Sequence, residues 1–200
     1  ITILVLNISQ DGSISNSFCI MVRSFIAGIV LLPVACSRMK NQQLSKAKIR
    51  DIAFSGLAMA STSILLFTSY QHIPSGIGVT LHYTYPMVVL ILSALLFHVH
   101  IGIKTVIAMF ISLIGILMLC DASTLEGNIL LGVSLALSSS LTFAIYLLWN
   151  ERRGLAILDS IIFVSLMSLF DTGDMFIYNL ISDQLDIKFS AKVAVILLLV

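Results

Sequence analysis

SFCIMVRSFIAGIVLLPVACSRMKNQQLSKAKIRD (residues 17–51) decides the fold, because a long apolar run is followed directly by a basic loop. The run 17–36 has the roughly 20 residues that a transmembrane helix needs, and Arg23 is its one charged residue. The loop 37–51 then holds Arg38, Lys40, Lys46, Lys48 and Arg50. This stretch predicts a membrane-spanning helix that ends on a basic side.

The same pattern continues along the rest of the chain. Further apolar runs of spanning length cover residues 52–70, 76–97, 103–120, 128–149 and 155–180. Hydrophobic residues make up 58% of the chain and charged residues 10%, and the mean hydropathy is +1.07. These values lie outside the range of soluble proteins. We therefore predict an all-α polytopic membrane helix bundle.

The basic residues occupy alternate loops. Beyond the loop 37–51, they lie at Lys104, Arg152 and Arg153, whereas the loops 71–75, 121–127 and 182–190 hold Lys188 and four carboxylates. By the positive-inside rule the basic side is cytoplasmic. The net charge of +1 sums two oppositely biased faces, so we expect no nucleic-acid partner.

We expect neither a cofactor nor a metal ion. The three cysteines lie within or at the ends of spans, without CxxC or metal-like spacing. His98 and His100 are too close in sequence for one helical face, and we interpret them as interfacial residues.

Two further patterns concern packing and the ends of the chain. Small residues recur at helical spacing and predict close helix packing: Ser55, Gly56, Ala60 and Ser63 on one span, and Ser134, Ser138 and Thr142 on another. The chain starts at Ile1 in an apolar remnant and closes inside the apolar run 194–200. We expect a fragment with the tail of one helix, six complete helices and the start of another.

YQHIPSGIGVTLHYTYP (residues 70–86), followed by an apolar run to Phe97, resembles the EamA type of drug/metabolite transporter. In that family a short outer turn precedes a helix with a mid-span proline. The likeness extends over most of the chain through Arg23, Gly115 and Gly127. One departure is His98-Val99-His100, where the family commonly has Gly-Glu, so the family's carboxylate has no counterpart here.

The resemblance implies ten helices in two inverted five-helix repeats, with both termini cytoplasmic. Residues 1–120 would then be the first repeat, from the end of helix 1 to helix 5. Residues 121–200 would begin the second repeat, with helices 6, 7 and part of 8. It also implies a multi-pass protein of the cell membrane, such as the bacterial inner membrane.

Polar residues inside the spans are the candidate site residues. Pro86 lies about ten residues, or about 15 Å, into its helix, where it removes a backbone hydrogen bond and leaves the His82 carbonyl without its normal partner. His82, Tyr85, Pro86 and Val89 follow i, i+3, i+4 and i+7 spacing and share a face. We predict that His82, Tyr85 and Pro86 bind substrate. The open alternative is a packed kink in which neutral His82 bonds to a neighbouring helix.

Three charged residues within spans complete the candidates. Arg23 lies about 9 Å from the outer end of its helix, where it binds an anionic substrate group or pairs with Asp171 or Asp174; both alternatives stay open. Asp171 is the candidate for proton coupling, because a carboxyl in low dielectric can exchange a proton near neutral pH. For Asp174 we prefer a helix break at Asp-Thr-Gly-Asp (residues 171–174).

Three classes of function can be compared. An intramembrane hydrolase would need a motif such as GxSxG or HExxH, and neither occurs, so we expect no enzyme. A structural or accessory membrane protein is the alternative, but it does not account for charges within spans. We predict a secondary transporter of small metabolites, amino acids or drugs, working by alternating access. Its partners are a small-molecule substrate and the lipid bilayer, and a homodimer stays open.

Overall fold

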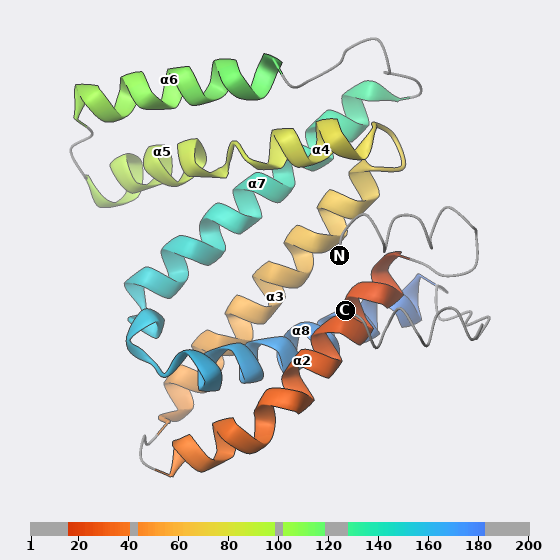
Figure 1. Cartoon of the computed structure of the whole chain (residues 1–200), viewed down its shortest axis with the longest axis vertical. Helices are drawn as coiled ribbons and strands as arrows, with labels where there is room; N and C mark the ends of the chain where they lie inside the picture. Colours follow the sequence, from red (N-terminus) through yellow and green to blue (C-terminus); the bar gives the residue numbers. More distant parts are fainter. Residues whose placement is uncertain (1–15, 41–43, 99–101, 119–127, 183–200) are drawn as a thin grey trace. The chain divides into compact units, whose positions relative to one another are not determined.

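The computed structural model describes residues 16–40, 44–98, 102–118 and 128–182, and these residues are almost entirely helical (Figure 1). The helices are α2 (Asn16–Met39), α3 (Lys46–Ser69), α4 (Ser75–His82), α5 (Tyr85–Phe97), α6 (Ile103–Met118), α7 (Ile129–Arg152) and α8 (Ser160–Ile181), with a short 3-10 helix, η2 (Leu155–Ile157), before α8. The all-α fold is therefore confirmed. The predicted outer loops 121–127 and 183–190, Val99, His100 and both chain ends lie outside the described residues.

Five stretches in the described part of the chain are long and apolar enough to cross a membrane: Ser17–Met39, Lys46–Ser69, Ser75–Phe97, Ile129–Arg152 and Ser160–Ile181. They correspond to five of the six predicted spans. The sixth, predicted over residues 103–120, is helical as α6 over 16 described residues. A multi-pass membrane helix bundle follows.

The chain divides into two compact units, and the division falls within α3. Unit 1 comprises residues 1–60 and 153–200, and unit 2 comprises residues 61–152. Each is described by itself below.

In unit 1, α2 and α8 run antiparallel and are joined along their length. At one end the Ser17 hydroxyl donates to the Asn179 Oδ1 at 2.6 Å, and at the other the Arg38 guanidinium meets Asp159 at 2.7 Å. Between them, Ser165 donates to the backbone carbonyl of Gly28 at 3.0 Å. Interhelical hydrogen bonds of this kind support helix association in lipid, where apolar contacts alone give little preference.

Two glycines let the helices of unit 1 approach closely. A Cβ at Gly28 would lie 2.8 Å from the Leu169 side chain, and one at Gly56 would lie 2.7 Å from the Phe170 Cβ. At Gly56 it would also meet backbone atoms of α8, at 3.1 Å from the Asp171 nitrogen. The predicted packing role of Gly56 is thus confirmed, since only a residue without a side chain fits there.

The basic end of unit 1 is held by carboxylates. Asp159 is the N-cap of α8 and accepts from the Ile161 backbone nitrogen at 3.0 Å. Its ion pair with Arg38 lowers the pKa of the Asp159 carboxyl from its ordinary value. Asp51 on α3 lies 4.0 Å from the Arg50 guanidinium and 3.9 Å from that of Arg153. Each carboxylate is therefore paired with the basic residues that the sequence analysis places on the cytoplasmic side.

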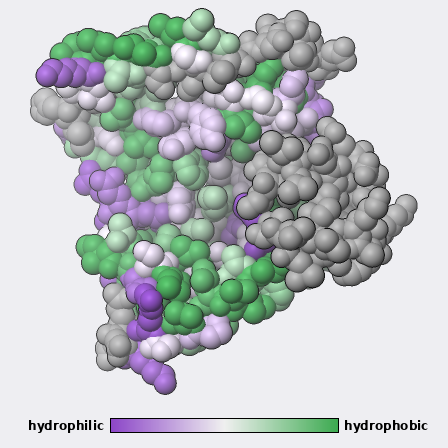
Figure 2. Space-filling model, viewed as in Figure 1, coloured by the Kyte–Doolittle hydropathy of each residue, from purple (hydrophilic) through white to green (hydrophobic). Residues whose placement is uncertain are grey.

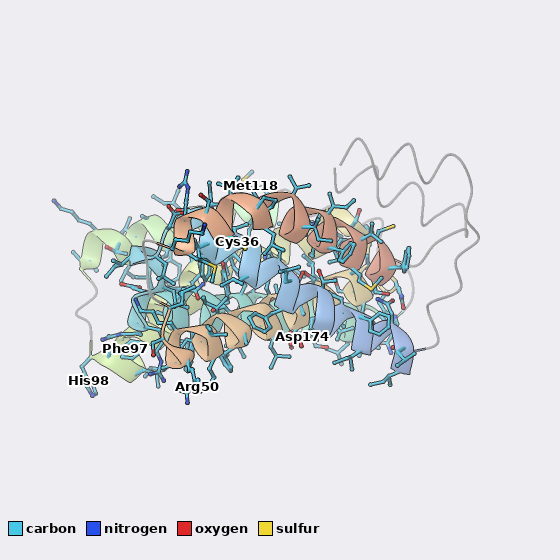
Figure 3. All side chains as sticks on the ribbon, turned by 90° about the horizontal axis from the view of Figure 1, so that it is seen from below. Cys36, Arg50, Phe97, His98, Met118 and Asp174 are labelled. Atoms are coloured by element: carbon cyan, nitrogen blue, oxygen red, sulfur yellow. The ribbon has the colours of Figure 1, made fainter. Side chains whose placement is uncertain are left out.

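In unit 2, the α4–α5 segment runs parallel to α7. Gly132, near the start of α7, lies against Ile73, just before α4, where an added Cβ would come within 2.6 Å. At the other end the Arg152 guanidinium lies 3.5 Å from the centre of the Phe97 ring, and Phe97 and His98 mark the end of α5 in Figure 3. Parallel helices agree with the prediction that both segments begin on the same side of the membrane.

α6 presents apolar side chains to its surroundings, as the green surface in Figure 2 shows. Its exposed hydrophobic residues are Ile103, Ile107, Phe110, Ile111, Ile114 and Met118. Such an apolar surface is what a helix in contact with lipid or with further apolar helices requires.

Two predictions about helices are wrong. α8 continues through residues 171–174 to Ile181, so the helix break preferred at Asp174 is absent; the Thr172 hydroxyl donates to the Ser168 carbonyl within an unbroken helix, and one glycine there costs only about 1 kcal/mol. On α7 the predicted packing is wrong for Ser134 and Ser138, which are exposed, whereas Thr142 does meet a neighbouring helix, with its hydroxyl 2.8 Å from that of Thr62. The buried small residues of α7 are Gly132, Ala136, Ser139, Ser140 and Ala144.

Candidate functional site

The most irregular part of unit 2 is the break between α4 and α5. α4 ends at His82 and α5 begins at Tyr85 (Figure 1). Pro86 is the second residue of α5, where the backbone N–H that proline lacks would have no helical partner. The backbone nitrogens of Tyr83 and Thr84 bond to Val79 and Leu81 and close α4. The interruption predicted from Pro86 is confirmed, and it is a full restart of the helix.

His82, at the end of α4, is hydrogen-bonded to α7. Its Nδ1 lies 3.0 Å from the Ser139 hydroxyl oxygen. Because that hydroxyl donates to the Ala136 carbonyl at 2.7 Å, its oxygen is left to accept from His82 Nδ1–H. In the neutral imidazole Nε2 is then an acceptor, and it has no hydrogen-bond partner among the described residues. His82 thus offers one unused acceptor at the helix break.

Thr84 makes a second polar contact with α7 inside the break. Its hydroxyl donates to the Leu81 carbonyl at 2.7 Å and lies 3.1 Å from the Ser140 hydroxyl. Since the Thr84 proton is already used, Ser140 is the donor in this pair. Both residues are buried. The break is therefore fixed to α7 by two neighbouring serines.

Four rings surround the His82 contact, and we call them the aromatic cluster: His82, Tyr85, Phe143 and Tyr146. The Phe143 ring lies 5.3 Å from that of His82 and 4.7 Å, edge to face, from that of Tyr85. Tyr146 stacks on Phe143 at 5.6 Å, and the His82 and Tyr85 rings are 5.8 Å apart. The cluster combines apolar ring faces with an imidazole and two phenols, so it suits a ligand with an apolar body and a hydrogen-bond donor.

The predicted common face of His82, Tyr85 and Pro86 is only partly assembled. His82 and Tyr85 meet in the aromatic cluster, whereas Pro86 is exposed. The helical spacing from which the common face was inferred does not continue through Tyr83 and Thr84, because the helix stops there. Pro86 therefore acts on the cluster through the backbone break.

In unit 1 a buried carboxyl lies in the middle of α8, at Asp171. It is 4% exposed, and the Ser24 hydroxyl of α2 donates to its Oδ2 at 2.5 Å. Arg23 is exposed and forms no ion pair with Asp171 or Asp174 among the described residues, although its charge lies within electrostatic range of Asp171. The direct Arg23–Asp171 pair is thus replaced by the adjacent Ser24.

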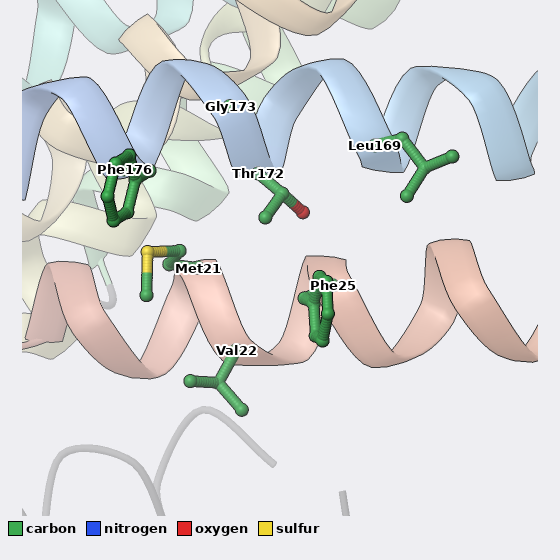
Figure 4. Close-up of a pocket in the computed structure, with 7 residues that line it drawn as sticks. All are labelled: Met21, Val22, Phe25, Leu169, Thr172, Gly173 and Phe176. Carbon is green, nitrogen blue, oxygen red and sulfur yellow. The ribbon is translucent and has the colours of Figure 1, made fainter.

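A groove of about 420 Å³ lies on the α2–α8 pair of unit 1 (Figure 4). Its lining residues are Met21, Val22, Phe25, Leu169, Thr172, Gly173 and Phe176. Thr172 supplies the one polar side chain of this lining, and neither Arg23 nor Asp171 belongs to it. The groove therefore offers apolar contact and does not coincide with the polar residues predicted for the site.

Sequence reasoning missed six residues of these contacts: Ser24, Thr84, Ser139, Ser140, Phe143 and Tyr146. The signal for Ser24 was its place beside a charged residue within a span. The signal for Ser139 was the run Ser138-Ser139-Ser140, which spreads three hydroxyls over more than half of the helix circumference and so favours contact with a neighbouring helix. Phe143 follows Ser139 by one helical turn and gave no separate signal.

Comparison with known proteins gives one match. The model of the EamA-like transporter family covers residues 1–120. No curated protein and no solved structure in the comparison matches the chain. The matched part contains α2 to α6, including the turn and the broken helix from which the resemblance was drawn. With its span-length apolar helices and this match over more than half of its length, the chain belongs to the EamA-like transporter family.

Proposed function

We propose that this chain belongs to a secondary transporter of the cell membrane, which moves small metabolites such as amino acids or drugs by alternating access. Membership of the EamA-like transporter family supports a transporter of the multi-pass type. An accessory membrane protein without transport activity is the alternative, and enzymatic activity is not part of the proposal.

The observation that carries the proposal is the broken helix at His82–Tyr85. In secondary transporters, discontinuous helices near the middle of the bilayer form substrate sites, because their ends leave polar backbone groups to be satisfied by ligand or side chain. Here the break adjoins the unused Nε2 acceptor of His82 and the aromatic cluster. We infer that a substrate N–H or O–H donates to His82 while its apolar part contacts Tyr85 and Phe143.

The two-repeat plan belongs to the same proposal. Residues 1–120 form the first repeat and residues 121–200 the start of the second, so α7 and α8 would be helices 6 and 7. The parallel course of the α4–α5 segment and α7, and the antiparallel course of α2 and α8, agree with this order. Alternating access would then move one repeat against the other.

Flux into proteoliposomes of the full-length protein tests the proposal. Pooled labelled amino acids and small metabolites are offered with and without an imposed pH gradient. His82→Ala and Ser139→Ala are expected to reduce the flux at unchanged expression, because they remove the polar contact at the break. Ser138→Ala is the matched control, since Ser138 is exposed and its hydroxyl donates to Ser134 of its own helix at 2.7 Å.

Arg23→Ala tests the predicted substrate residue of unit 1 in the same assay. A loss of flux for anionic compounds alone would assign Arg23 to the substrate. Folded wild-type protein that moves no compound would favour the accessory role, and equal flux in wild type, His82→Ala and Ser139→Ala would remove the site from the helix break.

A further inference from the structure

Asp171 lies near the middle of α8, eleven residues after Ser160 and ten before Ile181. At 1.5 Å per residue this is about 16 Å from the helix start, roughly half of the hydrocarbon thickness. Counted instead from residue 155, where the predicted span begins, Asp171 would lie further toward the outer side, but η2 and the N-cap of α8 lie within residues 155–159, and α8 begins at Ser160. A carboxyl group at mid-membrane depth is costly when ionised and is by default a functional position.

The surroundings of Asp171 are unlike those of Asp51 and Asp159, two ion-paired carboxylates of unit 1. Asp51 and Asp159 lie within 4.0 Å of guanidinium groups, whereas Asp171 accepts a hydrogen bond from the Ser24 hydroxyl at its Oδ2. Its Oδ1 is buried and has no hydrogen-bond partner among the described residues. A proton on Oδ1 removes the charge and leaves Oδ2 to accept from Ser24.

Three helices pack around this carboxyl, and few charged groups face it. α2 brings Arg23, whose charge is within electrostatic range. α8 itself brings Asp174, a half-buried carboxyl three residues later. α3 packs against the Asp171 backbone through Gly56, and its residues 52–60 include no titratable side chain. An ionised Asp171 therefore has Arg23 as its single cationic neighbour among these groups.

Ser24 and Arg23 are adjacent on α2, so they differ by about 100° around the helix axis. A rotation of α2 through an angle of this order would exchange the neutral hydroxyl for the guanidinium as the partner of Asp171. We propose that Asp171 is the proton-binding group that drives this transporter: it bonds to Ser24 when protonated and to Arg23 when ionised. The proton comes from water and returns to water, so no other reactant is needed. This inference rests on the proposed transport function.

The proton itself is the first probe. Infrared titration of the full-length protein in nanodiscs follows the carbonyl stretch of protonated carboxyl groups, without any substrate. Asp171→Asn is expected to remove one such band that titrates in the wild type, and Asp174→Asn is expected to leave it. A spectrum of Asp171→Asn identical to the wild type would overturn the inference.

Transport gives the second readout, with the labelled amino-acid and metabolite pools as probe. Asp171→Asn is expected to keep exchange across the membrane without a gradient and to lose the response to an imposed pH gradient. Arg23→Gln is expected to lose that response too, and Arg23→Lys to restore it, because the ionised form needs a cation. Unchanged gradient response in Asp171→Asn would refute the inference while the transport function stands.

Two further outcomes are treated separately: no transport by the wild type, and failure of Asp171→Asn to fold. If wild-type protein moves no compound, the transport proposal fails, and the infrared titration shows independently whether Asp171 holds a proton. If Asp171→Asn does not fold, Ser24→Ala and Arg23→Gln carry the test, since each removes one of the two alternating partners. Gradient response retained by both would overturn the inference.

Discussion

The two units join their helices in different ways. In unit 1, α2 and α8 are unbroken and are connected at four levels, through Ser17–Asn179, Ser24–Asp171, Gly28–Ser165 and Arg38–Asp159. In unit 2, the segment that faces α7 is interrupted after His82, and its polar contacts gather at the interruption. Polar side chains thus hold long helices together in one unit and fix a helix break in the other.

The two kinds of helix contact allow different movements. An unbroken helix pair with bonds along its length can move as a body or rotate by exchanging partners. A broken helix can bend where its own backbone bonds are missing. We expect substitutions in unit 1 to act on stability and coupling, and substitutions at the break to act on binding.

The largest expected effect is at the closest helix approach of unit 1. Gly56→Ala places a Cβ against the Phe170 Cβ and the Asp171 backbone, and since backbone cannot move aside we expect a loss of about 1–3 kcal/mol. Gly173→Ala is the matched control, because open space surrounds it within α8, and a gain of about 0.5–1 kcal/mol is expected. Unfolding in mixed detergent–SDS micelles measures both. Equal stability of the two variants would contradict the close approach.

At the break of unit 2 a smaller loss is expected. Ser139→Ala leaves His82 Nδ1–H without its acceptor, which costs about 1 kcal/mol. Ser138→Ala should change little, as its hydroxyl bonds within α7. The same unfolding assay compares them. If Ser138→Ala destabilised more than Ser139→Ala, the face of α7 that meets the break would be assigned wrongly.

At the C-terminal end of α5, one substitution is expected to increase the stability of the protein. His98 has a φ of 52°, in the left-handed region, and its N–H bonds to the Ser93 carbonyl as a helix C-cap. Glycine adopts this conformation without the steric cost of a side chain, so His98→Gly should stabilise the protein by about 0.5–1 kcal/mol. His98→Ala should give no gain. An increase in melting temperature for alanine equal to that for glycine would argue against backbone strain.

The smallest effect concerns the exposed Arg38–Asp159 pair. Because Arg38 lowers the pKa of folded Asp159 below its ordinary value of 3.8, its contribution to stability is complete above that value and is lost as the pH falls through the folded pKa. Melting temperatures across this acid range should therefore drop less for Asp159→Asn, which keeps the N-cap but not the charge, than for the wild type. Parallel curves for the two proteins would show that the pair does not contribute.

The helices of the fold could be predicted from the sequence, because a segment that crosses the bilayer can adopt few structures. Apolar runs of spanning length must be helices, and each predicted span is mainly helical over its described residues, with interruptions at residues 83–84 and 158–159. The interruption near Pro86 was also predictable, since proline cannot continue the backbone ladder. The form of this interruption could not be predicted. It is a two-residue turn at Tyr83 and Thr84, and it depends on the hydrogen bond between Thr84 and Ser140 of α7.

The residues that pair between neighbouring helices could not be predicted in the same way. The small-residue pattern on α7 predicted packing through Ser134, Ser138 and Thr142. Thr142 does bond to Thr62, yet among the serines Ser139 and Ser140 are the buried pair. A triplet of serines presents hydroxyls in several directions, so only the position of the neighbouring helix decides which is buried. For the same reason the sequence offered Arg23 as the partner of Asp171, and the structure pairs it with Ser24.

The α2–α8 contacts join residues that are up to 162 positions apart. At a synthesis rate of about 5–20 residues per second, α2 enters the bilayer on the order of 10–30 s before α8 exists. During this interval Ser17, Ser24 and Gly28 have no α8 to bind. Biogenesis thus requires that α2 be apolar enough to insert before α8 exists, and that it stay available to a helix that is synthesised much later.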